Sequence, residues 1–127
     1  MKKTKILILS WLLALALILP AHAQMTVFDL EGTAKDHEAL SSITTSTGFT
    51  SSKVNHATYG PAKAALITVE TAGVRVMFHG SDPTTSTGHP MNAGDSFVIR
   101  GTANVSQTRF INASAGNGAV VRATFYY

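Results

Sequence analysis

The sequence of 127 residues contains no cysteine. This absence excludes disulfide bonds, thiolate zinc sites and cysteine nucleophiles. Small exported domains often depend on disulfides, because their hydrophobic cores are small. A domain of this size without disulfides must be stabilised by side-chain packing or by association with other subunits.

Charged residues are also scarce, at 13% of the chain. Three of the ten Lys and Arg residues lie within the first five positions, so seven basic and seven acidic residues remain from Met25 onward. A domain with no net charge and no Lys/Arg cluster gives no support for nucleic-acid binding. We therefore expect no nucleic acid among its partners.

Long apolar runs are absent except at the N-terminus. A start with three lysines precedes an apolar run over residues 6–19, and Pro20 and small residues follow it. This layout predicts a secretory signal peptide over residues 1–23, with cleavage between Ala23 and Gln24. The run is shorter than the roughly 20 residues that span a bilayer, so we expect a cleaved leader rather than a membrane anchor. The mature domain, residues 24–127, would then be periplasmic or extracellular.

The mature part has no sustained helical period, and alternation of apolar and polar residues dominates instead. This alternation predicts strands with one buried face. The predicted strands cover residues 64–70, 74–79, 97–100, 109–113 and 119–127. Their buried faces would carry Ala65, Ile67 and Val69, then Val74, Val76 and Phe78, and finally Val121, Ala123, Phe125 and Tyr127.

Turn residues separate these strands. The break at residues 71–73 predicts a hairpin between the strands on either side of it, and Asn117-Gly118 predicts a second hairpin. Residues 80–88 form a loop by composition, and residues 93–95 form a tight turn. We also expect a short extended piece over residues 89–92.

The N-terminal part of the domain is less regular. Residues 26–33 and 53–59 resemble strands, and the second leads into a Gly60-Pro61 turn. Residues 34–40 fit a single helical turn or a loop, and residues 41–52 fit an exposed strand or a loop. Six to eight short strands predict an all-β fold, as one small antiparallel β-sandwich or a jelly-roll-like barrel.

Four residues that could bind a metal or move protons, His79, Asp82, His89 and Asp95, lie close together in the sequence. We interpret them as surface and turn residues, because His79 lies on the polar face of its strand, His89 follows a loop glycine, and the histidine pair that cupin metal sites use is missing. The serines lack a G-x-S-x-G motif, and the spacing of the acidic residues selects no catalytic pair. We therefore expect no enzymatic activity, no cofactor and no metal site.

Aromatic residues make up only 8% of the chain, and three of them end it. We expect one of these three to pack inward, while Tyr126 faces a partner or solvent.

The segment that begins at Pro61 and runs to Gly101, followed by RFINA and a terminal VRATFYY, resembles small β-sandwich proteins encoded among the structural genes of tailed bacteriophages. The resemblance extends to Tyr127. The shared pattern is A-x-I-T-V-E-T-A, an arginine strand, G-x-x-P-T-x-x-x-G-H, a G-D turn and a closing aromatic strand. The matching positions are Ala65 to Ala72, Arg75, Gly80, Pro83, Thr84, Gly88, His89, Gly94, Asp95 and Phe125. The resemblance implies a non-enzymatic virion component, such as a capsid decoration or head-associated protein, and no catalytic residue carries over.

The leader departs from this resemblance, because virion proteins assemble in the cytoplasm and do not normally carry export signals. Met25 follows the cleavage region directly and would suit the start of a phage protein. Translation from Met25 predicts a virion location, and use of the leader predicts export. The mass of the native N-terminus separates these cases.

Two functions therefore stay open. The first is a structural or assembly protein that associates with itself or with capsid and other virion proteins. The second is a secreted or cell-surface module that binds a glycan or a protein through a loop on a rigid scaffold. The candidate contact residues of this loop are Asp82, Thr84, Thr85, Thr87 and His89.

Overall fold

The computed structural model describes residue 30, residues 32–116 and residues 118–127. The predicted signal peptide and its cleavage site at Ala23-Gln24 lie outside the described residues, so both stay predictions. Most of the predicted strand over residues 26–33 also lies outside them. No helix in the described part of the chain is long and apolar enough to cross a bilayer.

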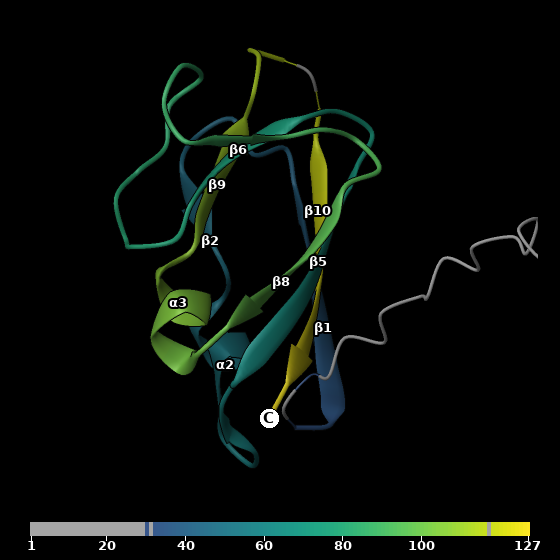
Figure 1. Ribbon diagram of the computed structural model, residues 1–127, viewed down its shortest axis with the longest axis vertical. Helices are drawn as coiled ribbons and strands as arrows, with labels where there is room; N and C mark the ends of the chain where they lie inside the picture. The colour runs from purple at the N-terminus through teal and green to yellow at the C-terminus, as the bar shows by residue number, and fades with distance from the viewer. Residues whose placement is uncertain (1–29, 31, 117) are drawn as a thin grey trace, which may run out of the picture.

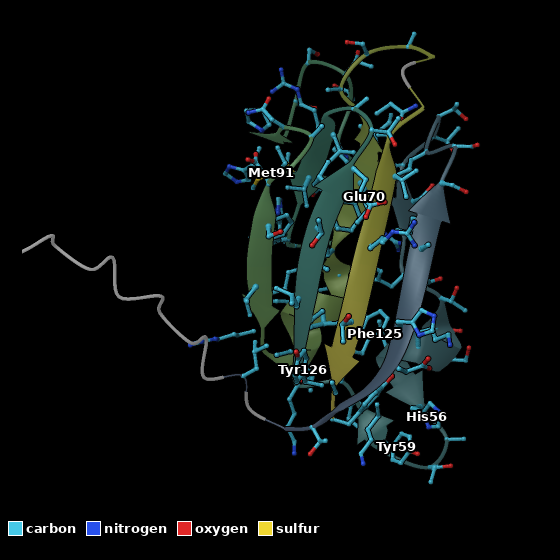
Figure 2. The ribbon with its side chains drawn as sticks, turned by 90° about the vertical axis from the view of Figure 1, so that its right-hand side faces the viewer. His56, Tyr59, Glu70, Met91, Phe125 and Tyr126 are labelled. Atoms are coloured by element: carbon cyan, nitrogen blue, oxygen red, sulfur yellow. The ribbon has the colours of Figure 1, made fainter. Side chains whose placement is uncertain are left out.

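The described residues form two four-stranded antiparallel sheets, which Figure 1 shows facing each other. The first, sheet A, has the order β1-β10-β5-β8, and Figure 2 shows its strands side by side. Its strands are β1 (Ala34–Ser41), β10 (Val120–Tyr126), β5 (Ala64–Glu70) and β8 (Ser96–Arg100). The second, sheet B, has the order β2-β9-β6-β7. Its strands are β2 (Thr47–Gly48), β9 (Arg109–Asn112), β6 (Val74–Met77) and β7 (His89–Met91).

Three smaller features complete the described fold. Strands β3 (Asn55–His56) and β4 (Gly60–Pro61) pair with each other. The short helices are α2 (Ser51–Val54) and α3 (Thr102–Gln107). The prediction of an all-β fold with antiparallel strands is confirmed.

The core lies between the two sheets, and both contribute fully buried side chains to it. Ile67, Val69, Val121 and Phe125 come from sheet A, and Val74, Val76 and Phe110 come from sheet B. Phe49 joins the two layers, because its ring makes edge contacts with Phe110 at 5.4 Å and with Phe125 at 5.2 Å. The alternation in β5, β6 and β10 therefore predicted the buried faces correctly.

Both predicted hairpins are wrong. Strand β5 pairs with β10 and β8, whereas β6 pairs with β7 and β9, so residues 71–73 carry the chain from one sheet to the other. Thr71 makes this bend with a φ of 69°, which is unusual for a β-branched residue. Strands β9 and β10 also belong to different sheets. Alternation reports which face of a strand is buried, and it does not report which strand lies alongside.

The chain changes sheet at most of its connections. Between sheets A and B it crosses from β1 to β2, from β2 by way of β3 and β4 to β5, and then from β5 to β6, β7 to β8, β8 to β9 and β9 to β10. Among the described strands of these two sheets, only β6 and β7 follow each other within the same sheet. The tight turn predicted at residues 93–95 is confirmed, and Gly94 adopts a φ of 93° there.

The prediction of a helical turn or loop over residues 34–40 is wrong, because this segment is strand β1. Asp36 and Glu38 lie on its partly buried side, where residues of the α2 region bind both carboxylates. Lys53 Nζ donates to Asp36 Oδ1 at 2.7 Å, and the backbone N–H and hydroxyl of Thr50 donate to the Glu38 carboxylate. Because Asp36 and Glu38 occupy the partly buried side of this edge strand, its sequence lacks the alternation of apolar and polar residues that predicts a strand.

Residues 53–59, predicted as a strand, instead contain the end of α2, the two-residue β3 and a turn. Residues 41–52 are mostly loop, as one of the two predictions had it, with β2 and the start of α2 inside them. Helix α3 was not predicted. It contributes only one buried residue, Val105, so it produces no helical period.

Candidate functional site

The loop predicted as a contact surface, residues 80–88 with His89, is held against sheet B by several attachments. We call it the contact loop. Arg75 on β6 donates through Nε to the carbonyl of Thr85 at 3.1 Å and through Nη1 to that of Gly88 at 3.0 Å. The Ser46 hydroxyl donates to Asp82 Oδ1 at 2.6 Å, and Pro83 is buried. The loop is therefore a fixed part of the domain.

The hydroxyl groups of the contact loop interact mostly with one another. The Thr84 hydroxyl lies 2.8 Å from the Thr87 hydroxyl and 3.2 Å from that of Ser86. The backbone N–H groups of Ser86 and Thr87 also donate to Thr84 Oγ1. These contacts make a local turn motif, in which the side chains replace water as hydrogen-bond partners.

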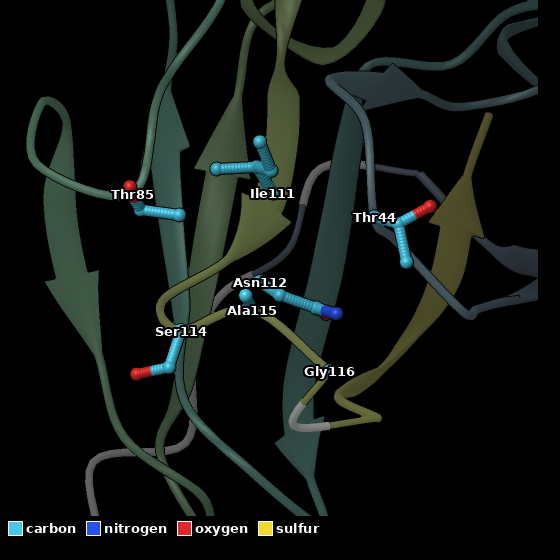
Figure 3. A pocket seen from close by; sticks show the side chains of 7 residues that line it. All are labelled: Thr44, Thr85, Ile111, Asn112, Ser114, Ala115 and Gly116. Carbon is cyan, nitrogen blue, oxygen red and sulfur yellow. The ribbon is translucent and has the colours of Figure 1, made fainter.

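A shallow hollow of about 180 Å³ lies beside the contact loop (Figure 3). It is smaller than the roughly 300–1,000 Å³ of most small-molecule pockets. In Figure 3 the Thr85 and Ile111 side chains face each other across it. Of the five candidate contact residues, only Thr85 lines the hollow. The lining residues are Thr44, Thr85, Ile111, Asn112, Ser114, Ala115 and Gly116.

Asn112 on β9 is a buried polar residue that no sequence pattern singled out. It is 2% exposed, and neither its Nδ2 nor its Oδ1 has a hydrogen-bond partner among the described residues. Figure 3 shows its carboxamide pointing away from Thr85. The alternation along β9 explains this orientation, because Phe110 and Asn112 share the inward face.

The structure gives local contacts to three of the four His and Asp residues considered for metal binding. Asp95 closes the turn before β8 by accepting from the Asn92 N–H at 2.7 Å, and Asp82 binds Ser46. The His89 ring lies 5.7 Å from the ring of Phe78, and His79 is exposed beyond β6. Among the described residues, no group of three or more His, Asp or Glu side chains could hold a metal ion.

A group of aromatic side chains lies at one end of the domain, where the β3–β4 turn meets the C-terminus (Figures 1 and 2). We call His56, Tyr59 and Tyr127 the end cluster. The rings of His56 and Tyr59 stack with 4.5 Å between centroids, and Tyr127 lies 5.6 Å from each of them. Tyr59 is 47% exposed, the only exposed large apolar side chain in the described part of the chain.

Charged groups surround the end cluster. Lys35 Nζ lies over the Tyr59 ring at 5.8 Å from its centroid. Lys53 and Asp36 form an ion pair beside Tyr127, whose hydroxyl donates to the carbonyl of Lys53 at 2.5 Å. The hydrogen bond from Lys53, helped by the backbone N–H of His37, lowers the pKa of Asp36, and burial raises the pKa of Tyr127.

No sequence pattern predicts the end cluster. The strand predicted over residues 53–59 has Tyr59 at its end, and no motif includes His56. The cluster joins residues from β3, from the β3–β4 turn and from the C-terminus, and no sequence motif links these positions. The C-terminal aromatics were a partial signal. Phe125 packs inward and is fully buried, as expected for one of them, and Tyr126 is half-buried on the opposite face of β10.

Comparisons of the chain with protein-family models, with curated proteins and with solved structures find no match. The resemblance to phage structural proteins therefore stays a prediction.

Proposed function

We propose that the chain is a β-sandwich with jelly-roll connectivity that works as a non-enzymatic binding module, and that the end cluster is its contact surface. The observation that carries this proposal is the Tyr59 ring. It is 47% exposed, yet His56 and Tyr127 hold it in place. An aromatic side chain that is both exposed and fixed suits recognition, because little conformational entropy is lost on binding.

The connectivity supports this proposal at the level of architecture. Two four-stranded sheets with repeated crossings between them are typical of jelly rolls, which occur in lectin and viral capsid domains. Fold alone does not select a function, so the choice depends on the surface. The end cluster favours binding, and export by the predicted leader would place this surface at the cell envelope or outside the cell.

The proposal is tested by measuring how the purified, fluorescently labelled protein binds to cell-envelope fragments from the organism that produces it. We expect saturable binding that Tyr59→Ala weakens at least tenfold. Thr85→Arg is the matched control, because it blocks the hollow beside the contact loop, also at an exposed position. Absence of saturable binding, or loss of binding in Thr85→Arg alone, would contradict the proposal.

A second candidate is the assembly function that the phage resemblance implies. Strand β1 favours it, because β1 is the longest of the described edge strands, and an edge strand can accept a strand from another subunit. This candidate predicts a native N-terminus at Met25 or Thr26 and copurification with capsids. A native N-terminus at Gln24, or a strictly monomeric protein absent from any particle, would exclude it.

A further inference from the structure

The exposed face of Tyr59 is the surface feature of the described residues that points most directly to a ligand class. The two rings of the His56–Tyr59 stack are inclined by 26°, so one face of Tyr59 is covered by His56. Tyr127 lies 5.6 Å from the same ring, yet Tyr59 remains 47% exposed. Such a surface can stack against a flat ligand.

The stack is rigid because its base is anchored. Nδ1 of His56 accepts hydrogen bonds from the backbone N–H of Thr58 at 3.1 Å and from that of Tyr59 at 3.4 Å. These bonds fix the imidazole against the turn that carries Tyr59. The hydrogen bond from Tyr127 to the Lys53 carbonyl fixes the third ring. A ligand would therefore meet a preformed surface.

The ring face attracts positively polarised groups, because its π-electrons make it negative. The ammonium of Lys35 is such a group, and it lies over Tyr59. Lys35 has no ion-pair partner in the described part of the chain, whereas the neighbouring Lys53 is paired with Asp36. A long, exposed lysine can move aside for a ligand and then donate hydrogen bonds to it.

A pyranose ring has the properties that this surface requires. One of its faces presents positively polarised C–H groups, and its edge carries hydroxyls that accept hydrogen bonds. We propose that the end cluster binds a saccharide, with one pyranose ring stacked on Tyr59 and Lys35 donating to the hydroxyls at its edge. This inference rests on the proposed function and names its ligand class.

The direct test is titration of the purified protein with cellohexaose, maltohexaose, chitohexaose and hexagalacturonate, followed by isothermal calorimetry and amide NMR. We expect saturable binding of at least one of them, with shifts confined to residues 56–60, Lys35 and Tyr127. Tyr59→Ala should weaken that binding on the order of tenfold, whereas Tyr59→Phe keeps the stack and should retain it within about threefold. Lys35→Met should weaken it by about threefold. No binding in the millimolar range, or equal binding by Tyr59→Ala and the unaltered protein, would overturn the inference.

A second measurement separates this inference from the proposed function. Periodate cleaves the vicinal diols of 1,4-linked hexose and hexuronate residues, whereas lysozyme and chitinase digest 1,4-linked N-acetylglucosamine chains, whose internal residues have no vicinal diol. Envelope fragments that receive both treatments should therefore no longer bind the protein if the ligand is a saccharide. Binding that survives both treatments and still requires Tyr59 would overturn the saccharide inference while it supports a binding module with a protein partner. If untreated envelope fragments show no binding that depends on Tyr59, both the saccharide inference and the proposed function are contradicted.

Discussion

The contact loop and the end cluster differ in what their chemical groups already do within the domain. In the contact loop, the hydroxyls of Thr84, Ser86 and Thr87 bind one another, and Arg75 binds two backbone carbonyls. In the end cluster, His56 Nδ1 and the Tyr127 hydroxyl bind backbone groups, but Tyr59 is still 47% exposed. Composition alone makes a loop rich in Ser and Thr resemble a binding surface. The structure shows that such residues can be used to fix the loop itself.

The largest expected effect tests whether Arg75 holds the contact loop in place. Arg75→Met removes two charge-assisted hydrogen bonds to carbonyls and should lower the free energy of unfolding by about 2 kcal/mol. Urea denaturation measures the change. The matched control is Arg122→Met, which breaks an ion pair between more exposed side chains and should cost less than about 1 kcal/mol. Equal effects of the two variants would show that the loop does not depend on Arg75.

Asn112, under the hollow, should respond in the opposite direction. Asn112→Val replaces a buried carboxamide without partners by an apolar, strand-favouring side chain of similar size. We expect the free energy of unfolding to rise by about 1 kcal/mol in thermal or urea unfolding. Asn112→Asp places a charge at the same position and should be destabilising. A destabilising Asn112→Val would mean that a buried water satisfies the carboxamide.

At the end cluster, Tyr127→Phe removes one hydrogen bond and keeps the ring. The loss of the bond to the Lys53 carbonyl should cost about 1 kcal/mol. Because burial raises the pKa of Tyr127, the unfolded chain loses the phenolic proton first, and stability falls as the pH rises above about 10. Unfolding measured between pH 8 and 11 should show a weaker alkaline decline in the variant. An unchanged alkaline decline would assign it to other groups.

The smallest effect concerns Asp36, whose pKa is lowered by its hydrogen bond from Lys53. A lowered folded-state pKa contributes stability above the unfolded value of about 4, and this contribution is lost as the pH falls through the folded-state pKa. Asp36→Asn should therefore reduce the difference between the urea midpoints at pH 7 and pH 3. The matched control is Asp82→Asn, which changes an exposed carboxylate that forms no ion pair among the described residues. A full acid dependence in Asp36→Asn would contradict the assignment.

The sequence predicted which side chains are buried better than it predicted which strands pair with each other. Alternation identified Ile67, Val69 and Phe125 as inward-facing, because each strand has one buried face whichever strand lies beside it. It failed at residues 71–73, where the same pattern fits a hairpin and a crossing between sheets equally well. Strand β1 was missed because Asp36 and Glu38 have partners that come from a distant segment.

The end cluster was harder to predict, because its residues also come from segments that are far apart in the sequence. Only the fold identifies Tyr59 as part of a candidate site, because it places Tyr59 beside Tyr127 at the C-terminus. Turn chemistry predicted the contact loop, and the structure confirms that residues 80–88 form a loop. Whether any of its side chains contacts a ligand stays a prediction.

Strand β10 also has a consequence for how quickly the protein folds. It lies between β1 and β5, and Tyr126 pairs with Ala34 on one side and Ala64 on the other. Both pairings close long stretches of chain, so sheet A cannot form by adding neighbouring hairpins one after another. Domains that depend on such distant pairings fold in milliseconds to seconds rather than microseconds. Until β10 arrives, β1 and β5 remain unpaired along the edges that it covers, and during this interval the chain is most exposed to aggregation and proteolysis.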